Sequence, residues 1–418
     1  MKNFLFLAML ASVVPALAAD LQTASVAINQ LGLDLLPRAG APTENALLSP
    51  YSIQVALAMT YAGADGDTRI EMSRVLHFPA NGAVLDASFA ALSQSLTDAV
   101  TQQHQRNEQT RKYGETGDDI ELRVANRLFG QQGYEFRALF LDVLKTTYAA
   151  PLEALDFQHG AEAARHHINS WVEAQTAKKI VDLIPGGGLT TDTRLVLTNA
   201  LYFKAPWTRS FDKSATDDLP FFIRGGTPQD VPTMRKQYSV PYAKYSGFTA
   251  IALPYAGSDL HFLILLPDSS DGLAALEKEL TPELLAECAT MKPQLVALEL
   301  PKLKLQPATI PLGQTLQALG LKTAFDQPHG SANFDRMAPR KPDDYLFIGE
   351  VFHKTFLTLD EEGTEAAAAT AVVMLRATGM PSSPPKPIVV KVDHPFLFAI
   401  QHRDSGACLF LGRVTDPR

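Results

Sequence analysis

A run of residues near the end of the sequence, Thr364 to Ala377, contains no proline or glycine and only two charges, Glu365 and Arg376. Gly363 stands directly before the run, and a proline-rich segment begins at Pro381 after it. A strand that enters the middle of a sheet buries alternate side chains, so every second residue must be small or apolar and none can be proline. The alternate residues that meet this condition are Thr364, Ala366, Ala368, Thr370, Val372 and Met374. The segment is composed like a buried element but bounded like a mobile loop.

Two local properties of the run bear on this interpretation. Gly363 gives the chain freedom at the bend, and the alanines are small enough to pack with little steric resistance. The alanines also favour a helix over Ala366 to Leu375. A helix does not explain the missing polar face or the prolines that follow, so we treat it as one conformer of the segment.

The composition limits the possible partners. The chain has 418 residues, of which 46% are hydrophobic and 20% charged, the balance of a globular protein with a large core. The net charge of -8 argues against nucleic acid as a partner, because phosphate binding needs clustered lysine and arginine. No apolar stretch after residue 20 has the length of a membrane span. Cys288 and Cys408 are too few for a disulfide framework; whether they pair stays open, and two separate buried thiols are favoured.

Residues 1–18 have the pattern of a secretory signal peptide. Lys2 is followed by an apolar run too short to cross a bilayer comfortably, and Ala16-Leu17-Ala18 supplies the small residues of a cleavage site. The pattern predicts a secreted or periplasmic protein whose remaining domain begins at residue 19. The choice between periplasm and extracellular space stays open.

Hydrophobic periodicity predicts helices mainly in the first part of the chain and strands mainly in the second half. The expected helices are Ser25–Leu36, Ser49–Ala62, Thr68–Leu76, Val84–Val100, Phe136–Tyr148 and Glu162–Lys178. The expected strands are Leu122–Phe129, Arg194–Phe203, Thr249–Pro254, His261–Leu266, Leu295–Leu305, Leu346–Asp360, Ile388–Val392, Phe396–Gln401 and Leu409–Val414. The polar segment Gln102 to Asp119 is expected to be a solvated insertion loop. Polyanion binding by Arg106, Arg111 and Lys112 is the less favoured alternative.

Most signatures of a hydrolase are missing from the sequence. It has no G-x-S-x-G elbow and no H-E-x-x-H zinc helix. Ser210 to Lys213 fits the letters S-x-x-K without the companion motifs of that enzyme class. His166 and His167 are adjacent on an expected helix, so their side chains diverge and cannot share a metal. We therefore expect no enzyme, no metal and no cofactor.

Four stretches resemble the serpins and keep the order and approximate spacing of that family. They are Asn45–Leu76, Thr198–Phe211, His353–Thr370 and His394–Phe398. The similarity runs from about residue 22 to the end, and its most specific part is the hinge sequence Glu-Glu-Gly-Thr-Glu-Ala-Ala-Ala-Ala-Thr. The resemblance implies an α+β serpin fold over residues 19–418, a single domain with three β-sheets, about nine helices and an exposed reactive-centre loop at about residues 361–387.

The resemblance also implies roles for particular residues. The hinge would comprise Glu361, Gly363, Thr364, Glu365, Ala366, Ala367, Ala368, Ala369 and Thr370. The polar cluster beneath the central sheet would comprise Ser49, Ser52, Asn199 and His353, and Trp207 would lie where the loop enters the sheet. Such a role explains a buried His353 better than catalysis does.

The activity implied by the resemblance is suicide-substrate inhibition of serine proteases by a monomer, with cysteine proteases as the alternative targets. The family's usual interval from the hinge glycine puts the scissile bond at Ala377-Thr378, which suits an elastase-like or subtilisin-like protease; Arg376-Ala377 would suit a trypsin-like one. Extra residues at Thr378 to Pro387 leave the register open, with Met374, Leu375, Thr378 and Met380 as further possible targets. The alternative function is that of a non-inhibitory serpin, a binding or folding-helper protein.

Overall fold

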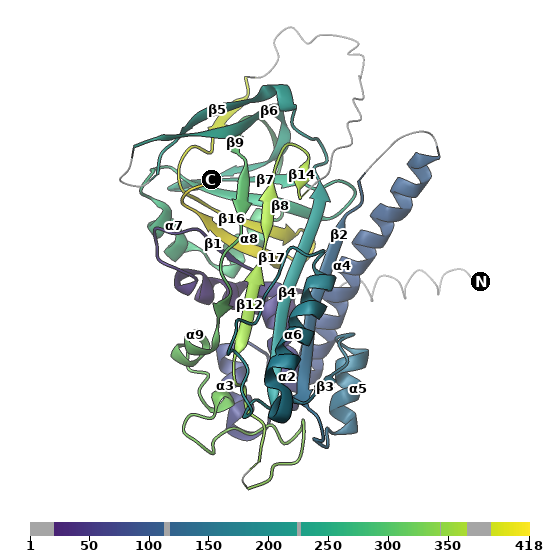
Figure 1. The fold of residues 1–418 in the computed structure, drawn as a ribbon. Helices are drawn as coiled ribbons and strands as arrows, with labels where there is room; N and C mark the ends of the chain where they lie inside the picture. The colour runs from purple at the N-terminus through teal and green to yellow at the C-terminus, as the bar shows by residue number, and fades with distance from the viewer. Residues whose placement is uncertain (1–20, 113–117, 224–226, 343, 366–385) are drawn as a thin grey trace, which may run out of the picture.

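The computed structural model describes residues 21–112, 118–223, 227–342, 344–365 and 386–418. Within these ranges the strands form two hydrogen-bonded networks, accompanied by nine α-helices when the helix at residues 21–35 is counted. Figure 1 shows the long strands β2 and β4 of one network along the length of the molecule, with the other network beside their upper ends. The predicted cleavage pattern at residues 1–18 lies outside the described ranges.

The first network is the central sheet, with the order β10-β13-β14-β4-β12-β11 and with β2 and β3 attached through β4. Its strands are β2 (Glu121–Gln131), β3 (Glu153–Leu155), β4 (Leu195–Pro206), β10 (Leu303–Leu305), β11 (Ile310–Pro311), β12 (Val351–Thr355), β13 (Leu357–Leu359) and β14 (Gly363–Thr364). Both faces of β4 are covered: Leu197 and Leu201 join the main core, while Val196 and Ala200 join a second core under α6. A strand buried on both faces reads as a continuous apolar run, which is why the sequence pattern found it.

The second network has the order β1-β17-β16-β8-β7-β6-β9-β15, with β5 paired to β6. Its strands are β1 (Ala46–Leu48), β5 (Thr216–Phe221), β6 (Gln229–Lys244), β7 (Phe248–Pro254), β8 (Leu260–Pro267), β9 (Pro293–Pro301), β15 (Ile388–Lys391), β16 (Phe396–His402) and β17 (Cys408–Val414). β6 is shared: Thr233 to Pro241 pairs with β9, and Tyr242 to Lys244 pairs with β7. Divided at this point of β6, the network is two sheets, and the expected three-sheet α+β architecture is confirmed.

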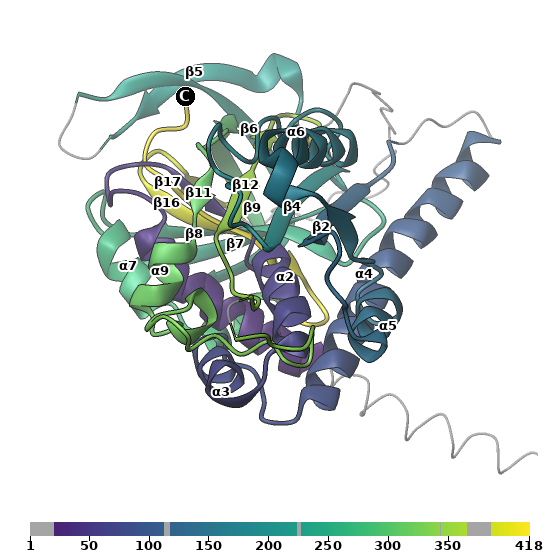
Figure 2. The same cartoon turned by 60° about the horizontal axis from the view of Figure 1, so that its bottom comes forward.

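The helices pack around these sheets, and α2 lies at their centre. After the helix at residues 21–35, they are α2 (Pro50–Gly63), α3 (Gly66–Val75), α4 (Gly82–Arg111), α5 (Ala138–Thr146), α6 (Phe157–Gln175), α7 (Leu273–Glu279), α8 (Pro282–Cys288) and α9 (Gly313–Ala318). α2 begins at Pro50 because the Ser49 hydroxyl accepts the Ser52 N–H and proline has no N–H to leave unpaired. All of its residues except Ala62 are buried, and Figure 2 shows it surrounded by other elements.

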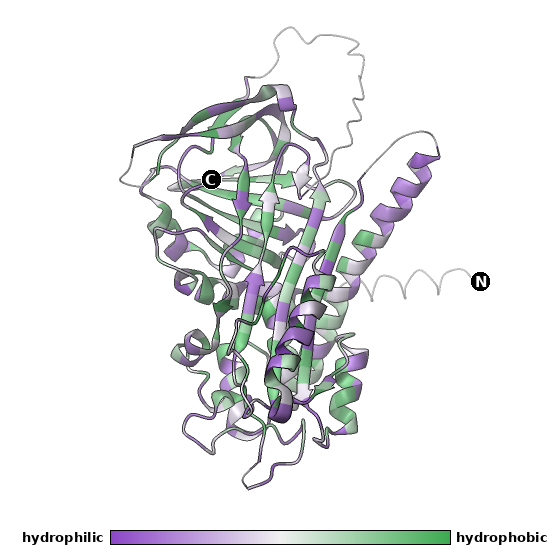
Figure 3. Cartoon of the chain, viewed as in Figure 1, coloured by the Kyte–Doolittle hydropathy of each residue, from purple (hydrophilic) through white to green (hydrophobic). Residues whose placement is uncertain are grey.

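The structure corrects the expectation of a loop from Gln102 onward. α4 continues to Arg111, because its first turns are anchored by buried leucines and Gln103 ties the later part to the chain. The Gln103 amide donates to Asp118 O at 2.9 Å and its oxygen accepts the Ile120 N–H at 3.0 Å. Figure 3 shows that the far end of α4 is hydrophilic, so this part of the helix needs no buried face.

The periodicity analysis missed β5, β6 and the short helices α7 to α9. Pro220, Pro232 and Pro241 interrupt β5 and β6, and proline removes a ladder hydrogen bond, so these segments did not match the pattern of a strand. The long pairing of β6 with β9 fixes them instead. None of the helices in the described ranges has the length and apolar character that a bilayer crossing requires.

Candidate functional site

The central sheet contains a fork between β4 and the β12–β13 strand. The lower part is closed, because β12 pairs in parallel with β4 from Val351 opposite Leu197 to Thr355 opposite Leu201. Above Thr355 the strands separate, and β14 lies between them. Thr364 of β14 is opposite Ala205 of β4 on one side and opposite Leu359 of β13 on the other. The upper end of the fork thus already holds a two-residue strand.

Gly363 and Thr364 fit this position closely. A Cβ atom on Gly363 would lie 2.1 Å from Ala205 O and 2.8 Å from Pro206 Cα, so another residue would push β14 away from β4. Thr364 is buried and its hydroxyl lies 2.5 Å from the Tyr255 hydroxyl. β14 therefore depends on a glycine followed by a small polar residue that points into the core.

Trp207 holds the turn through which the chain enters the fork. Its Nε1–H donates to Asp360 O at 2.9 Å, and its backbone N–H donates to Glu362 O at 2.8 Å. Its ring stacks on Tyr255 with centroids 4.7 Å apart and an interplanar angle of 10°. The sequence analysis placed Trp207 at this entry point and missed Tyr255, whose signal was only an aromatic residue after a strand.

Three acidic residues around β14 each bind a lysine from a different part of the chain. The pairs are Glu361 with Lys302 at 2.8 Å, Glu362 with Lys213 at 2.7 Å, and Glu365 with Lys179. Burial raises the pKa of Glu365, and the Lys179 ammonium acts against that rise. The hinge is therefore held by ion pairs as well as by the β14 ladder, and no sequence motif indicated these lysines.

The four predicted cluster residues meet in one buried network just below the fork. The Ser49 N–H donates to His353 Nε2 at 3.1 Å, so the ring proton is on Nδ1, which donates to Asn199 Oδ1 at 2.7 Å. The Ser52 hydroxyl donates to the same Asn199 oxygen at 2.7 Å. Since His353 is on β12 and Asn199 on β4, the network ties α2 to both strands that close the fork.

Burial shapes the chemistry of this network. It lowers the pKa of His353 to about 3, so the imidazole is neutral at physiological pH. Asn126 of β2, which the sequence analysis missed, donates to Ser52 O at 2.9 Å, and its Oδ1 lies 3.1 Å from the Ser52 hydroxyl oxygen. An asparagine within an apolar strand is the signal that could have found it. Within the described part of the chain, Asn199 Nδ2 is buried without a hydrogen-bond partner.

The remaining sequence candidates do not form a second site. Ala366 to Thr370 and the candidate bonds at Arg376, Ala377 and Thr378 lie outside the described residues. His166 and His167 contact different acids, Glu162 at 3.1 Å and Glu153 at 2.6 Å. Lys213, the lysine of the S-x-x-K letters, is engaged with Glu362. Among the residues described, no group of three potential ligands could hold a metal ion. Cys288 and Cys408 are both buried and free.

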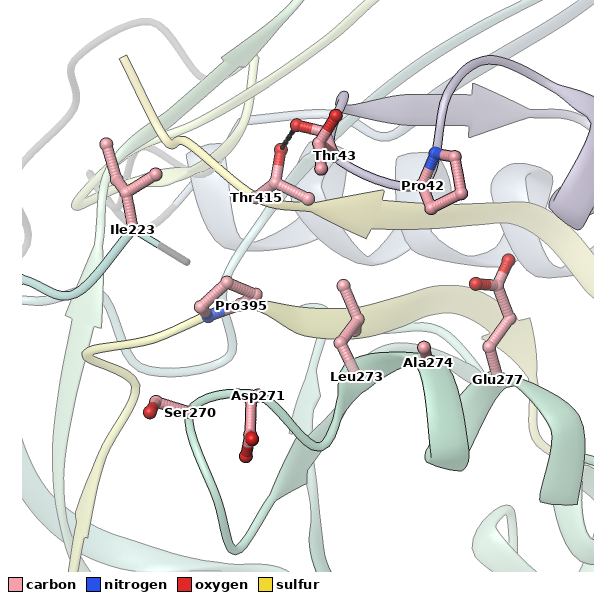
Figure 4. A pocket seen from close by; sticks show the side chains of 10 residues that line it. All are labelled: Pro42, Thr43, Ile223, Ser270, Asp271, Leu273, Ala274, Glu277, Pro395 and Thr415. Carbon is pink, nitrogen blue, oxygen red and sulfur yellow. Dashed lines mark hydrogen bonds between the residues drawn. The ribbon is translucent and has the colours of Figure 1, made fainter. Parts of the chain in front are cut away.

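A separate cavity of about 60 Å³ lies between α7 and the loop before β1 (Figure 4). Leu273, Ala274 and Pro395 form part of its apolar wall, with Glu277 at one end. The Glu277 carboxylate already accepts two hydrogen bonds from Arg413 Nη1, at 3.0 and 3.1 Å. With its charged group satisfied internally, the cavity is better explained as imperfect packing than as a ligand site.

Comparison with protein families matches residues 26–417 to the model described as "Serpin (serine protease inhibitor)". Human serpin B4 is 36% identical over 378 residues, covering 89% of this chain and 94% of that protein. The leukocyte elastase inhibitor of Bos taurus is 36% identical over 387 residues, covering 90% and 94%.

Solved structures also match nearly the whole length of this chain. Uncleaved ovalbumin has a TM-score of 0.75 at 26% identity, covering 94% of this chain and 100% of that chain. The thermophilic serpin tengpin in its native state has a TM-score of 0.79 at 26% identity, covering 95% and 94%. Human thyroxine-binding globulin complexed with its hormone has a TM-score of 0.74 at 27% identity, covering 95% and 99%.

These relatives correct the predicted location. Serpin B4, serpin B6 and the leukocyte elastase inhibitors belong to an intracellular group, so the expectation of a secreted or periplasmic protein is contradicted. The expectation depended only on the pattern of residues 1–18, in which a lysine, an apolar run and the small residues Ala16-Leu17-Ala18 follow one another. Such a pattern is weaker than similarity along nearly the whole length of these proteins.

Proposed function

Because this chain belongs to the serpin family of serine protease inhibitors, we propose that it traps its target protease by inserting the cleaved loop between β4 and β12. Protease inhibition is the function that the family and the relatives share. In the proposed reaction the protease cleaves the loop and remains attached as an acyl-enzyme. Insertion of the loop as a new strand then competes with hydrolysis of the ester. The family match over residues 26–417 also supports a single domain, taken as residues 19–418.

The observation that carries this proposal is the register of β14. Thr364 pairs antiparallel with β4 and with β13 at once, so the strand that would fill the fork has already begun. Extension of this register gives the following partners on β4: Ala366 with Phe203, Ala368 with Leu201, Thr370 with Asn199, and Val372 with Leu197. Phe203, Leu201 and Leu197 belong to the main core, so the small alternate residues of the loop would face the same buried side.

The extended register gives Thr370 a particular place. It would lie between Asn199 of β4 and His353 of β12, which are opposite each other now. Its hydroxyl would therefore arrive beside the Asn199 amide that lacks a partner among the described residues. A threonine at this position can accept that N–H, whereas an alanine or valine cannot.

The energy available from insertion is large enough to drive trapping. Fourteen residues at roughly 3.4 Å each span about 45 Å, enough to carry an attached protease along the sheet. About a dozen new backbone hydrogen bonds at roughly 1 kcal/mol each, with burial of two apolar side chains, amount to on the order of 10 kcal/mol. This is comparable to the whole stability of a domain, so the uncut form is expected to be kinetically trapped.

The proposed target is a protease with a small apolar primary pocket, such as an elastase-like or subtilisin-like enzyme. Cleavage at Ala377-Thr378 would present alanine to that pocket, and two relatives named leukocyte elastase inhibitor support this choice. A trypsin-like enzyme is the alternative if cleavage occurs at Arg376-Ala377 instead. The inhibitor is proposed to act as a monomer.

The test is a denaturing gel after the protein is mixed with elastase, subtilisin or trypsin. We expect a band of the summed mass that survives denaturation, because the acyl bond is covalent. Intact-mass analysis of the released peptide should show a new N-terminus at Thr378. Cleaved chain alone, with full protease activity remaining, would reject trapping, and a different N-terminus would move the assigned bond.

A second candidate function is that of a non-inhibitory binding protein. It is kept because thyroxine-binding globulin, which is described as a complex with thyroxine, shares this fold with a TM-score of 0.74. The residues Gly363 to Thr370 favour inhibition, since the alternate positions carry no bulky or charged residue. The same gel separates the two, because a binding protein is only cut.

A further inference from the structure

The α6–β4 linker, residues 176–194, passes beside the mouth of the fork on the side of the sheet that α6 covers. Its Ile180 and Ile184 are buried in the core under α6. The same core contains Phe356, the residue between β12 and β13 at which the strand leaves β4. Figure 1 shows α6 lying across β4 in this region. The linker is therefore packed against the place where an inserting strand would have to enter.

Lys179 of this linker contacts the hinge and the β12–β13 side of the fork mouth. Its ammonium forms an ion pair with Glu365 and lies 5.3 Å from the centroid of the Phe356 ring. Its position is set by a tight turn, in which Ala177 and Lys178 have φ of 50° and 62°. Residues other than glycine rarely adopt this left-handed conformation, so the turn is held by its surroundings.

Glu365 is the last hinge residue that the structure describes. Its N–H donates to Thr358 O at 3.0 Å, which continues the pairing of Thr364 with Leu359. Its φ of 51° is in the left-handed region, which residues other than glycine rarely adopt. Its side chain is only 11% exposed, and its ion-pair partner is Lys179. A cation beside such a carboxylate compensates for the part of its hydration that is lost.

We propose that Lys179 is a positioning residue for loop insertion, one that pins Glu365 at the fork mouth so that insertion starts in register. The inference rests on the proposed trapping function. In the extended register Ala367 enters between Phe356 and Tyr202, on the same face of the sheet as Glu365 and Lys179. Without the Lys179 ammonium, the Glu365 carboxylate regains its hydration by moving into solvent. This movement takes the hinge out of the fork. Insertion then starts later, and more of the acyl-enzyme is hydrolysed.

The test is the variant Lys179→Met, which keeps an aliphatic stem beside Phe356 and removes the charge. The measurement is the stoichiometry of inhibition, the moles of inhibitor consumed for each mole of protease trapped. We expect it to rise by about two- to fivefold, the range given by the loss of a partly buried ion pair. The rate of loop cleavage should be unchanged, because Lys179 pairs with Glu365, which precedes Ala377 of the proposed bond by twelve residues in the sequence. The unfolding temperature should also be unchanged, which separates positioning from a general loss of stability.

Two further variants make the result specific. Lys178→Met removes the neighbouring lysine, which is exposed, and should keep the unmodified stoichiometry. Glu365→Gln combined with Lys179→Met should restore a stoichiometry close to the unmodified value, because a neutral amide tolerates burial without a cation. Such a rescue would indicate that Lys179 acts through its charge, because a packing role of the lysine stem would not depend on the charge of Glu365.

The possible failures are distinguishable. If the unmodified protein forms no covalent complex with elastase, subtilisin or trypsin, the proposed function fails and the inference falls with it. If the unmodified protein traps a protease but Lys179→Met has the same or a lower stoichiometry, the positioning role is rejected while the trapping function stands. An equal rise in Lys178→Met, or no rescue by Glu365→Gln, rejects it as well.

Discussion

Acid should weaken the native protein through His353. Its Nε2 accepts the Ser49 N–H at 3.1 Å, so protonation of this nitrogen breaks the hydrogen bond and puts a charge in a fully buried site. Burial lowers the pKa of His353 to about 3, from an ordinary value of 6.5 that applies to the unfolded chain. Between these two values the unfolded chain binds a proton that the folded chain does not. The contribution of His353 is therefore complete above pH 6.5 and is lost as the pH falls toward 3.

The size of the effect follows from the gap between the two pKa values. At pH 5, protonation of this histidine stabilises the unfolded chain relative to the folded one by about 2 kcal/mol. This pH is 1.5 units below 6.5, and each unit contributes about 1.36 kcal/mol. Burial also lowers the pKa of His261, to about 4, and this adds a similar loss of unfolding free energy over most of the same pH range. The effect of His353 must therefore be measured as a difference between two proteins.

The assay is urea unfolding of the uncut protein followed by tryptophan fluorescence at several pH values from 8 to 5. The unmodified protein should lose about 2 kcal/mol more unfolding free energy across this range than His353→Gln, whose amide does not titrate. His159→Gln changes a histidine that is largely exposed and should keep the full pH dependence. Equal slopes for the unmodified protein and His353→Gln would refute the assignment of the acid sensitivity to His353.

Three further substitutions test the fork, the hinge and the packing. In the extended register, Ala368→Arg would place a charge between Leu201 and Thr355, so we expect the covalent band to disappear and the protein to be cut as a substrate. The control Ser382→Arg lies beyond Pro381 and should still give the band. Gly363→Ala places a Cβ 2.1 Å from Ala205 O and should raise the stoichiometry of inhibition. Gly349→Ala has open space around its Cβ and should not raise it. Equal stoichiometries for the two variants would contradict the close approach of Gly363 to β4. Ala274→Leu fills part of the cavity beside α7 and should raise the unfolding free energy by about 1 kcal/mol in urea unfolding, an increase that Ala275→Leu, which does not line the cavity, should lack.

The sequence predicted those elements whose signals are local. Ser49 and Pro50 mark the start of α2, and the apolar run at Leu195 to Phe203 marks β4. Family resemblance then located the polar cluster, because its four members lie within recognisable motifs. β6 could not be predicted in the same way, since its prolines break the pattern and only its pairing with β9 and β7 defines it.

The ion pairs that hold the hinge could not be predicted from the sequence, for a different reason. Lys179, Lys213 and Lys302 are surface-type residues in three separate segments, and nothing in their local sequence points to Glu361, Glu362 or Glu365. They meet only because the linker after α6, the turn before β5 and the segment between β9 and β10 all reach the fork. An ion pair between distant segments is a property of the folded chain, so periodicity and motif spacing do not encode it.

The position of β17 sets an order for the protein's biosynthesis. All seven of its residues are buried, and it lies between β1, near the other end of the chain, and β16. The ribosome adds Cys408 to Val414 after every other strand described, yet these residues occupy the interior of their sheet. Helices and the central sheet can begin to form during translation, but β1 has no neighbour in its sheet until Cys408 to Val414 have been made. A nascent chain stalled before Cys408 would leave that apolar edge open to chaperones or to another copy.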